Sequence, residues 1–267
     1  MANSYYGRFL HQTTTEFAMP RFMLNDELWS KLRNIMREHG IYDKPKLRLT
    51  VEGILYRLRT GIPWRDLPSV FGKWNSIFKQ FNNWSKRKKL IKIFNKLCED
   101  PDTEWEFIDG SIVKAHQHSA GAASRDDQAI GKSRGGNSTK IHLAVDAYGL
   151  PIKFEITGGQ VHDCKTAPEL VTRSPIADNV IADKAYDSDR LRKRIEEVGA
   201  IPVIPRKCNS KVGNDDMDWC LYKYRHLVEN AFARLKHFRA IATRYDKLKR
   251  NYEAMVALAC GIMWLPM

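Results

Sequence analysis

Two aspartates stand where a carboxylate is unusual. Asp109 interrupts the apolar run WEFIDGSIV (105–113), and Asp183 directly follows the apolar run NVIA (179–182). An ionised carboxylate inside an apolar strand is costly unless it lies at an exposed edge or is paired with a cation. Either residue alone is more often structural. Together they indicate a carboxylate site for a hard divalent cation, which prefers oxygen ligands.

A third acid, Glu229, lies in the segment 217–238, whose apolar residues recur at spacings of three and four as in an amphipathic helix. Around such a helix, Tyr222, Arg225 and Lys236 fall within about 60° of Glu229. On a solvated surface this row is an ordinary salt-bridge ladder. In an enzyme that acts on phosphates, it supplies a metal ligand flanked by cations for a phosphate group. The spacing leaves both interpretations open.

The elements that must position these acids are short strands and helices. The segments with strand composition are 105–113, 140–147, 152–157, 179–182 and 200–205. Residues 148–151 (YGLP) predict a hairpin between the second and third strands, and residues 166–171 and 188–198 have helical patterns. Consecutive strands followed by alternating helices and strands predict an α/β fold with a mixed sheet.

The first hundred residues differ in charge from the rest of the chain. Residues 1–100 contain 19 basic and 9 acidic residues, whereas residues 101–267 contain 25 and 22. Helices are expected at 24–37 and 50–59, then a short helix near Asp66–Pro68, a turn at Gly72 and a third helix from Trp74. This order is typical of a helix-turn-helix, although a helical bundle with a polar exterior has the same periodicity.

The third of these helices carries amides and lysines on its polar face. Amides can read adenine edges in the major groove, and lysines neutralise phosphates. We therefore predict DNA contacts for Asn75, Lys79, Gln80 and Lys86.

The composition excludes several other classes of protein. The 267 residues are 43% hydrophobic, but the sequence contains no run of 18 apolar residues, so we expect no membrane-spanning helix. The start lacks the apolar h-region of a secretory signal, so we expect no such signal. Five scattered cysteines without a CxxC pair predict a reducing cytoplasm and no structural zinc, although His116, His118, His162 and Asp163 are zinc-type ligands. His162 and Asp163 are expected beside the active site instead.

The spacing Tyr222-x2-Arg225-x3-Glu229-x6-Lys236 resembles the signature of bacterial insertion-sequence transposases of the DDE type, in their IS-five-like group. Further motifs match in the expected order over nearly the whole chain. They are GIPWRDLP (61–68), IDGSIVKAH (108–116), GKSRGGNSTKIH (131–142), GGQVHD (158–163), ADKAYDS (182–188), IPRK (204–207) and HLVENAFARLKHFRAIATRYDK (226–247).

The resemblance implies an all-α helix-turn-helix domain at 1–100 and a ribonuclease-H-like catalytic domain at 101–267. It assigns the catalytic, metal-binding triad to Asp109, Asp183 and Glu229, which would hold two Mg²⁺ or Mn²⁺ ions. The implied activity is binding of terminal inverted repeats, followed by metal-dependent DNA cleavage and strand transfer. A homodimer is expected in the complex that joins two element ends.

The resemblance also implies DNA contacts outside the helical domain. They fall on Tyr222, Arg225, Lys236, Lys140 and Arg134. Arg134 lies in the segment 117–139, and Lys140 directly follows this segment. As a bare sequence this segment is an irregular connection, whereas in this family it would order on DNA. Two alternatives stay open: a DNA-binding protein of transposase descent that has lost catalysis, and a metal-dependent nuclease without strand transfer.

Overall fold

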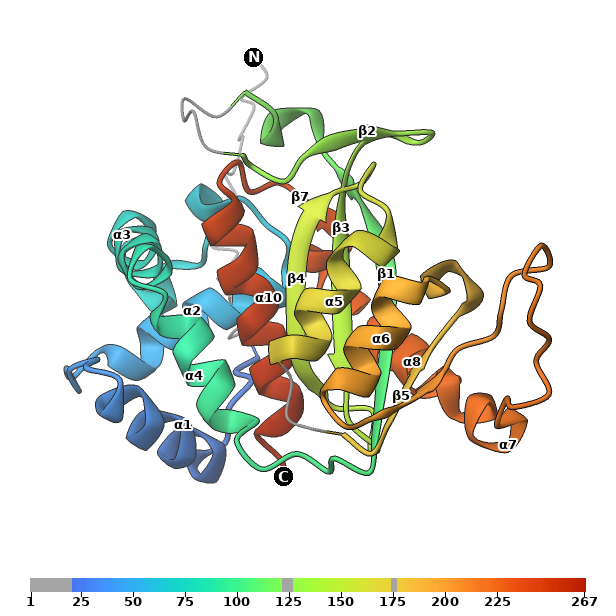
Figure 1. Ribbon diagram of the computed structural model, residues 1–267. Helices are drawn as coiled ribbons and strands as arrows, with labels where there is room; N and C mark the ends of the chain where they lie inside the picture. Colours follow the sequence, from blue (N-terminus) through green and yellow to red (C-terminus); the bar gives the residue numbers. More distant parts are fainter. Residues whose placement is uncertain (1–20, 122–126, 174–176) are drawn as a thin grey trace, which may run out of the picture.

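Four helices form the first part of the protein, whose computed structural model describes residues 21–121, 127–173 and 177–267 (Figure 1). Asn25 caps the first helix by accepting a hydrogen bond from the Leu28 amide, and Gly61 ends the second with a left-handed φ of 71°. These two ends lie within two residues of those expected for helices at 24–37 and 50–59. The helices are α1 (Asp26–Glu38), α2 (Leu47–Thr60), α3 (Trp74–Lys86) and α4 (Lys89–Leu97).

The connection between α2 and α3 contains two 3₁₀ turns, Trp64–Asp66 and Ser69–Phe71, in place of the one short helix that we predicted. Pro63 and Pro68 directly precede these turns, and proline removes the amide that a continuous helix would need. Helix α3 begins at Trp74 as predicted. Helix α4 (Lys89–Leu97) is an element that the sequence analysis does not predict.

A mixed sheet forms the second part of the protein, with β1 at its centre. β1 is antiparallel to β3, and β3 to β4; on its other side β1 is parallel to β5, and β5 to β6. This order confirms the predicted ribonuclease-H-like α/β class. The strands are β1 (Trp105–Ala115), β2 (Gly131–Ser133), β3 (Gly136–Val145), β4 (Pro151–Gly158), β5 (Asn179–Ala182), β6 (Ile201–Val203) and β7 (Thr243–Arg244).

Helices cover both faces of this sheet (Figure 1). Helices α5 (Asp163–Arg173) and α6 (Asp189–Glu197) lie on one face, and α8 (His226–Lys236) lies on the other. Ser188 caps α6 by accepting a hydrogen bond from the Leu191 amide, as its sequence predicts. Because side chains alternate along a strand, neighbouring residues of β1 face α5 and α8 in turn.

The helix expected over 217–238 is not continuous, so that prediction is wrong. The chain forms α7 (Trp219–Tyr222), then a 3₁₀ turn at Lys223–Arg225, then α8. A tertiary contact accompanies the interruption: Tyr224 stacks on Trp105 of β1, with ring centroids 5.3 Å apart. Tyr222 and Arg225 therefore lie outside the regular helix that carries Glu229.

The C-terminal helix α10 (Lys249–Trp264) lies between the helical region and the sheet (Figure 1). Its Trp264 indole donates a hydrogen bond to the carbonyl of Pro151 at the start of β4 (2.6 Å), and its Gly261 packs against Leu97 of α4. One apolar core runs through both parts as a result. The division of the chain into two domains at residue 100 remains a prediction.

The segment 117–139 is mostly ordered in the part that the structure describes. It contains a 3₁₀ turn at Gln117–Ser119 and the hairpin of β2 and β3. The fully buried guanidinium of Arg244 donates hydrogen bonds to Thr139 Oγ1 (2.8 Å) and to the carbonyls of Ala129 and Gln128 (3.0 and 2.8 Å). These bonds anchor the hairpin to the core. Within the described ranges, no helix is long and apolar enough to cross a bilayer.

Candidate active site

Asp109 and Asp183 lie side by side at the centre of the sheet. Strands β1 and β5 run parallel, and their register pairs Ile108 with Ala182. Each aspartate is the residue that directly follows its member of this pair. Neighbouring strands lie about 4.8 Å apart. The fold therefore places two acids that are 74 positions apart in the sequence next to each other, one in β1 and one at the end of β5.

Glu229 joins this pair through a shared cation. It lies in the first turn of α8, whose buried residues Val228, Phe232 and Leu235 fix the helix in place. The guanidinium of Arg225 forms ion pairs with both Glu229 Oε1 and Asp109 Oδ2, the latter at 3.5 Å. One arginine therefore bridges two of the three predicted acids.

The carboxyl group of Asp109 is electrostatically unusual. Burial raises its pKa from 3.8 to about 6, while the Gly110 amide and Arg225 lower it and the charges of Asp183 and Asp163 raise it further. The raised pKa reflects mainly the cost of burying the charged carboxylate, which Arg225 offsets only in part. A divalent cation bound here would offset that cost further.

The three acids fit a hard divalent cation in their chemistry, since every donor atom is a carboxylate oxygen. In the conformation described, however, the three carboxylates do not form a metal site. In the described chain, no three Asp, Glu, His or Cys side chains are close enough together to hold a metal ion. Because Arg225 pairs with Glu229 and Asp109, it would have to move for all three carboxylates to share a cation. The metal role of the triad remains a prediction.

The raised pKa of Asp109 gives a testable effect on stability. The folded-state pKa lies above the unfolded value, so ionised Asp109 destabilises the native state at neutral pH, and this penalty disappears as pH falls from about 6 towards 4. We expect Asp109→Asn to stabilise the protein by up to about 3 kcal/mol at pH 7.5. Thermal unfolding of both proteins between pH 4 and 8 measures the difference.

The control for that experiment is Asp178→Asn, which changes an exposed aspartate just before β5. It should leave the unfolding temperature unchanged at every pH. An Asp109→Asn variant that unfolds at a lower temperature than wild type at pH 7.5, or a difference that does not vary with pH, would contradict the assignment.

Lys236 is the last residue of α8, and Tyr222 is the last residue of α7. The exposed Lys236 donates a hydrogen bond to Ser111 Oγ at 2.7 Å, and Ser111 is two residues beyond Asp109 on the same face of β1. Tyr222 is half-buried, and its ring packs edge-on against Trp219. Of the predicted DNA contacts in the segment 217–238, Arg225 and Lys236 are the two that the structure brings beside the acids.

Lys140 is placed differently from the prediction. Its side chain is 9% exposed, its ammonium lies 3.0 Å from Asp163 Oδ1, and it donates a hydrogen bond to the carbonyl of Val161. It is therefore a buried partner of a carboxylate and does not offer a free charge for DNA. Arg134, at the turn between β2 and β3, is exposed, and its contact with DNA remains a prediction.

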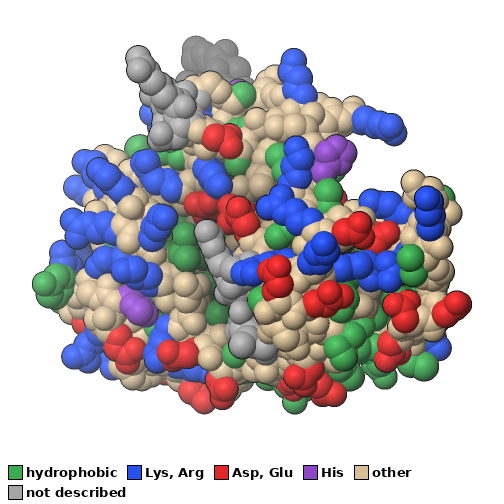
Figure 2. All heavy atoms as spheres, in the orientation of Figure 1, with side chains coloured by type: hydrophobic (Ala, Val, Ile, Leu, Met, Phe, Trp, Pro, Cys, Tyr) green, Lys and Arg blue, Asp and Glu red, His purple; other side chains and the backbone are tan. Residues whose placement is uncertain are grey.

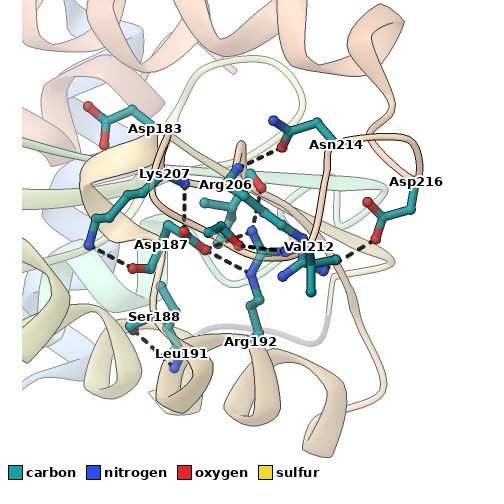
Figure 3. Close-up of polar contacts among 12 residues, drawn as sticks. Asp183, Asp187, Ser188, Leu191, Arg192, Arg206, Lys207, Val212, Asn214 and Asp216 are labelled. Atoms are coloured by element: carbon teal, nitrogen blue, oxygen red, sulfur yellow. Dashed lines mark hydrogen bonds and ion pairs between the residues drawn. The ribbon is translucent and has the colours of Figure 1, made fainter.

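A network of polar contacts holds the turn that follows Asp183 (Figure 3). Asp187 accepts hydrogen bonds from Arg192 (2.9 and 3.0 Å) and from the amide of Lys207 (2.8 Å). Burial alone would raise the pKa of Asp187, but these partners lower it below its usual value. The carboxylate of Asp183 points away from this network, and its Oδ1 accepts a hydrogen bond from Ala185. The network leaves Asp183 free of competing side-chain hydrogen bonds from these residues.

The predicted DNA-reading residues of α3 lie on its accessible face. Asn75, Lys79 and Lys86 are exposed, and Gln80 is half-buried. Basic side chains gather over the helical region on the face seen in Figure 2. Gln80 also lines a cleft of about 340 Å³ between α3 and the α1–α2 connection. The basic residues lining this cleft are Lys44, Lys46, Arg87 and Lys89.

Sequence reasoning missed several residues around Asp109. Gly110 and Ser111 belong to the motif IDGSIVKAH and Tyr186 to ADKAYDS; each motif surrounds a predicted acid, but no pattern in the sequence distinguishes these three residues. Asp163 was expected near the site, and the structure places its carboxylate against Gly110. His162 beside it is exposed.

Comparisons with known proteins show the family of the chain. Residues 106–264 match the family described as Transposase DDE domain, and residues 24–94 match the family described as Putative transposase of IS4/5 family. A putative transposase for insertion sequence element IS6501 from Brucella ovis is 38% identical over 132 residues, which cover 48% of this chain and 98% of that protein. The transposase for element IS1106 from Neisseria meningitidis serogroup B is 33% identical over 45% of this chain and 44% of its own length.

Among solved structures, the chain aligns with the crystal structure of a pre-cleavage Mos1 transpososome at 9% identity and a TM-score of 0.28. The alignment covers 85% of this chain and 80% of that chain. A likeness this low places no individual residue. The family matches cover both the helical region and the sheet, and the match over residues 106–264 alone spans more than half of the sequence. The chain therefore belongs to the DDE transposases of insertion sequences, in the IS4/5 family.

Proposed function

We propose that this transposase binds the terminal inverted repeats of its insertion sequence and there cleaves and rejoins DNA by metal-dependent phosphoryl transfer. The observation that supports this most is the register of β1 and β5, which sets Asp109 beside Asp183. The link from Asp109 through Arg225 to Glu229 adds the third acid of the family signature.

The three carboxylates would hold two Mg²⁺ or Mn²⁺ ions. Bound cations of this kind lower the pKa of the attacking water or 3′-hydroxyl and neutralise charge on the leaving 3′-oxygen. Asp109, Asp183 and Glu229 supply the negative charge that holds them, and no protein nucleophile is needed for the reaction.

The cationic residues beside the acids would bind and orient the DNA strand. Arg225 presents a planar guanidinium, which suits bidentate contact with phosphate oxygens. Lys236 is held next to Asp109 by its hydrogen bond to Ser111. A phosphate bound between Arg225 and Lys236 would lie next to the carboxylates of Asp109 and Glu229. Tyr222 and Arg134 are further candidates for DNA contacts.

Helix α3 would read the terminal repeats. Removing Lys79 or Lys86 is expected to weaken binding to all DNA sequences alike. Each removal should also reduce the slope of log K against log[salt] by about one, the amount that corresponds to one phosphate contact. Replacing Asn75 or Gln80 by Ala should instead relax specificity by about 1–3 kcal/mol at the contacted base pair. Fluorescence anisotropy at several salt concentrations measures both effects.

Lys193→Ala is the matched control, because Lys193 is an exposed lysine on α6 and has no proposed DNA contact. Its salt dependence should equal that of the wild type. An unchanged salt dependence in both Lys79→Ala and Lys86→Ala would exclude α3 as the DNA-binding element.

Joining two element ends requires two active sites, so we expect a homodimer in the synaptic complex. The protein would bind its DNA substrate in the cytoplasm. The five free cysteines are compatible with that reducing compartment.

The proposal is tested by incubating the full-length protein with Mg²⁺, a supercoiled target plasmid and a duplex that carries the DNA flanking its coding region. We expect cleavage at the element end and joining of the cut strand to the plasmid. Binding without cleavage would show a transposase descendant that has lost catalysis. Cleavage without joining would show a nuclease.

A further inference from the structure

Behind Asp109, on the face of the sheet that α5 covers, two polar side chains contact the backbone of β1. We propose that Asp163 and Tyr186 are positioning residues, which contact Gly110 and thereby fix the orientation of the Asp109 carboxylate. This inference rests on the proposed catalytic role of Asp109 and adds two residues that the triad does not include.

Both side chains lie where a Cβ of residue 110 would stand. A Cβ atom at this position would lie 2.5 Å from Asp163 Oδ1 and 3.2 Å from Tyr186 Oη. The first distance is shorter than any normal contact to carbon, and the second is tight. Both oxygens therefore occupy the space that a side chain would fill, so a Cβ at this position would displace the Asp163 carboxylate.

Gly110 in turn controls Asp109. Its amide donates a hydrogen bond of 2.7 Å to Asp109 Oδ1, which leaves the other oxygen, Oδ2, facing Arg225. A shift of the Gly110 backbone would move this donor and rotate the carboxylate. Holding Gly110 in place is therefore equivalent to holding Asp109 in one orientation.

Asp163 is itself held by buried groups from β3. Its Oδ1 lies 3.0 Å from the ammonium of Lys140 and 3.6 Å from Nδ1 of His142. His142 is fully buried, and its Nε2 shares a hydrogen bond with Thr157 Oγ1 at 2.8 Å. Burial lowers the pKa of His142 to about 4, so the imidazole is neutral and Lys140 balances the charge of Asp163.

Tyr186 completes the contact from the turn that follows Asp183. Its side chain is 1% exposed, and its hydroxyl has no hydrogen-bond partner among the residues that the structure describes. A buried hydroxyl without a partner is rare, because it loses its bonds to water. Burial and the charges of Asp163, Asp109 and Asp183 raise its pKa, so it stays protonated beside these acids.

The test uses Tyr186→Phe, Asp163→Asn and Gly110→Ala in the full-length protein. Mn²⁺ binding without DNA is measured from the electron paramagnetic resonance signal of free Mn²⁺, and cleavage and DNA binding are measured separately. We expect Mn²⁺ affinity and cleavage to fall by about 10–100-fold, as for other residues that orient metal ligands, while DNA affinity is unchanged. Tyr186→Phe is decisive, because it removes one oxygen without changing any charge.

Matched controls separate positioning from loss of fold. Gly213→Ala adds a Cβ that meets Asp215 at an ordinary distance of 3.6 Å, and Tyr148→Phe removes an exposed hydroxyl. Asp163 and Asp189 are the first residues of α5 and α6. Asp189→Asn therefore makes the same change at the start of a helix, but at an exposed carboxylate. Each control should bind Mn²⁺ as wild type does. The unfolding temperature of Tyr186→Phe should equal or exceed that of wild type, since its buried hydroxyl has no hydrogen bond to lose.

The outcomes are distinguishable from failure of the proposed function. If Tyr186→Phe and Gly110→Ala bind Mn²⁺ and cleave DNA as wild type does, the positioning role is wrong and the transposase chemistry stands. If the wild type binds Mn²⁺ and the variants lose it, but no protein cleaves element ends, the positioning role stands and the proposed function fails. Folded variants with weaker DNA binding and normal Mn²⁺ binding would also overturn the inference.

Discussion

Replacing Asp109, Asp183 or Glu229 by the corresponding amide is expected to lower the rate of DNA cleavage by about three orders of magnitude or more. Each amide keeps the shape of the side chain but removes a negative charge that holds the cations. Metal-ion catalysis contributes several kcal/mol to lowering the barrier, and about 1.4 kcal/mol corresponds to each tenfold in rate. Single-turnover cleavage of a labelled element end measures the loss.

DNA binding provides the internal comparison for these variants. Since α3 lies outside the triad, affinity for the element end should stay within a few-fold of wild type. Asp178→Asn, an exposed aspartate just before β5, should cleave at the wild-type rate. Full activity in any one of the three amide variants would remove that acid from the proposed mechanism.

Arg225→Gln is expected to have opposite effects on metal and DNA. In the structure, Arg225 pairs with Glu229 and Asp109, so its guanidinium competes with any cation for the same oxygens. Removing it should therefore strengthen Mn²⁺ binding to the DNA-free protein. It should also weaken cleavage by about 10–100-fold, because a charge-assisted hydrogen bond to phosphate contributes about 1.5–3 kcal/mol.

Arg234→Gln is the matched control, since Arg234 is an exposed arginine on α8, the helix that directly follows Arg225. It should change neither quantity. Weaker Mn²⁺ binding in Arg225→Gln would show that Arg225 supports the carboxylates as they bind a cation and does not compete with it. Titration of Mn²⁺ into each DNA-free protein distinguishes the two results.

The sequence predicts those parts of the site that depend on local pattern. An acid inside or just after an apolar strand located Asp109 and Asp183, and the four-residue spacing of Arg225 and Glu229 predicts the contact that the structure shows. The hairpin between β3 and β4 and the caps of α1 and α6 follow from short-range chemistry in the same way.

The remaining features depend on packing between distant segments. Lys140 looks like a free cation in the sequence, and only the approach of Asp163 shows that it is buried. The contact of Asp163 and Tyr186 with Gly110 joins three separate motifs, so no local pattern contains it. The interruption of the 217–238 helix is likewise accompanied by a tertiary contact, the stacking of Tyr224 on Trp105.

The most direct test of the account is anomalous diffraction from crystals of the protein soaked in Mn²⁺. We predict an anomalous peak within bonding distance of carboxylate oxygens of Asp109 and Asp183, with Glu229 as a further ligand once Arg225 has moved. Manganese bound elsewhere, with these three carboxylates free of metal and Arg225 still bridging Asp109 and Glu229, would contradict the central claim that the fold gathers them into one cation site.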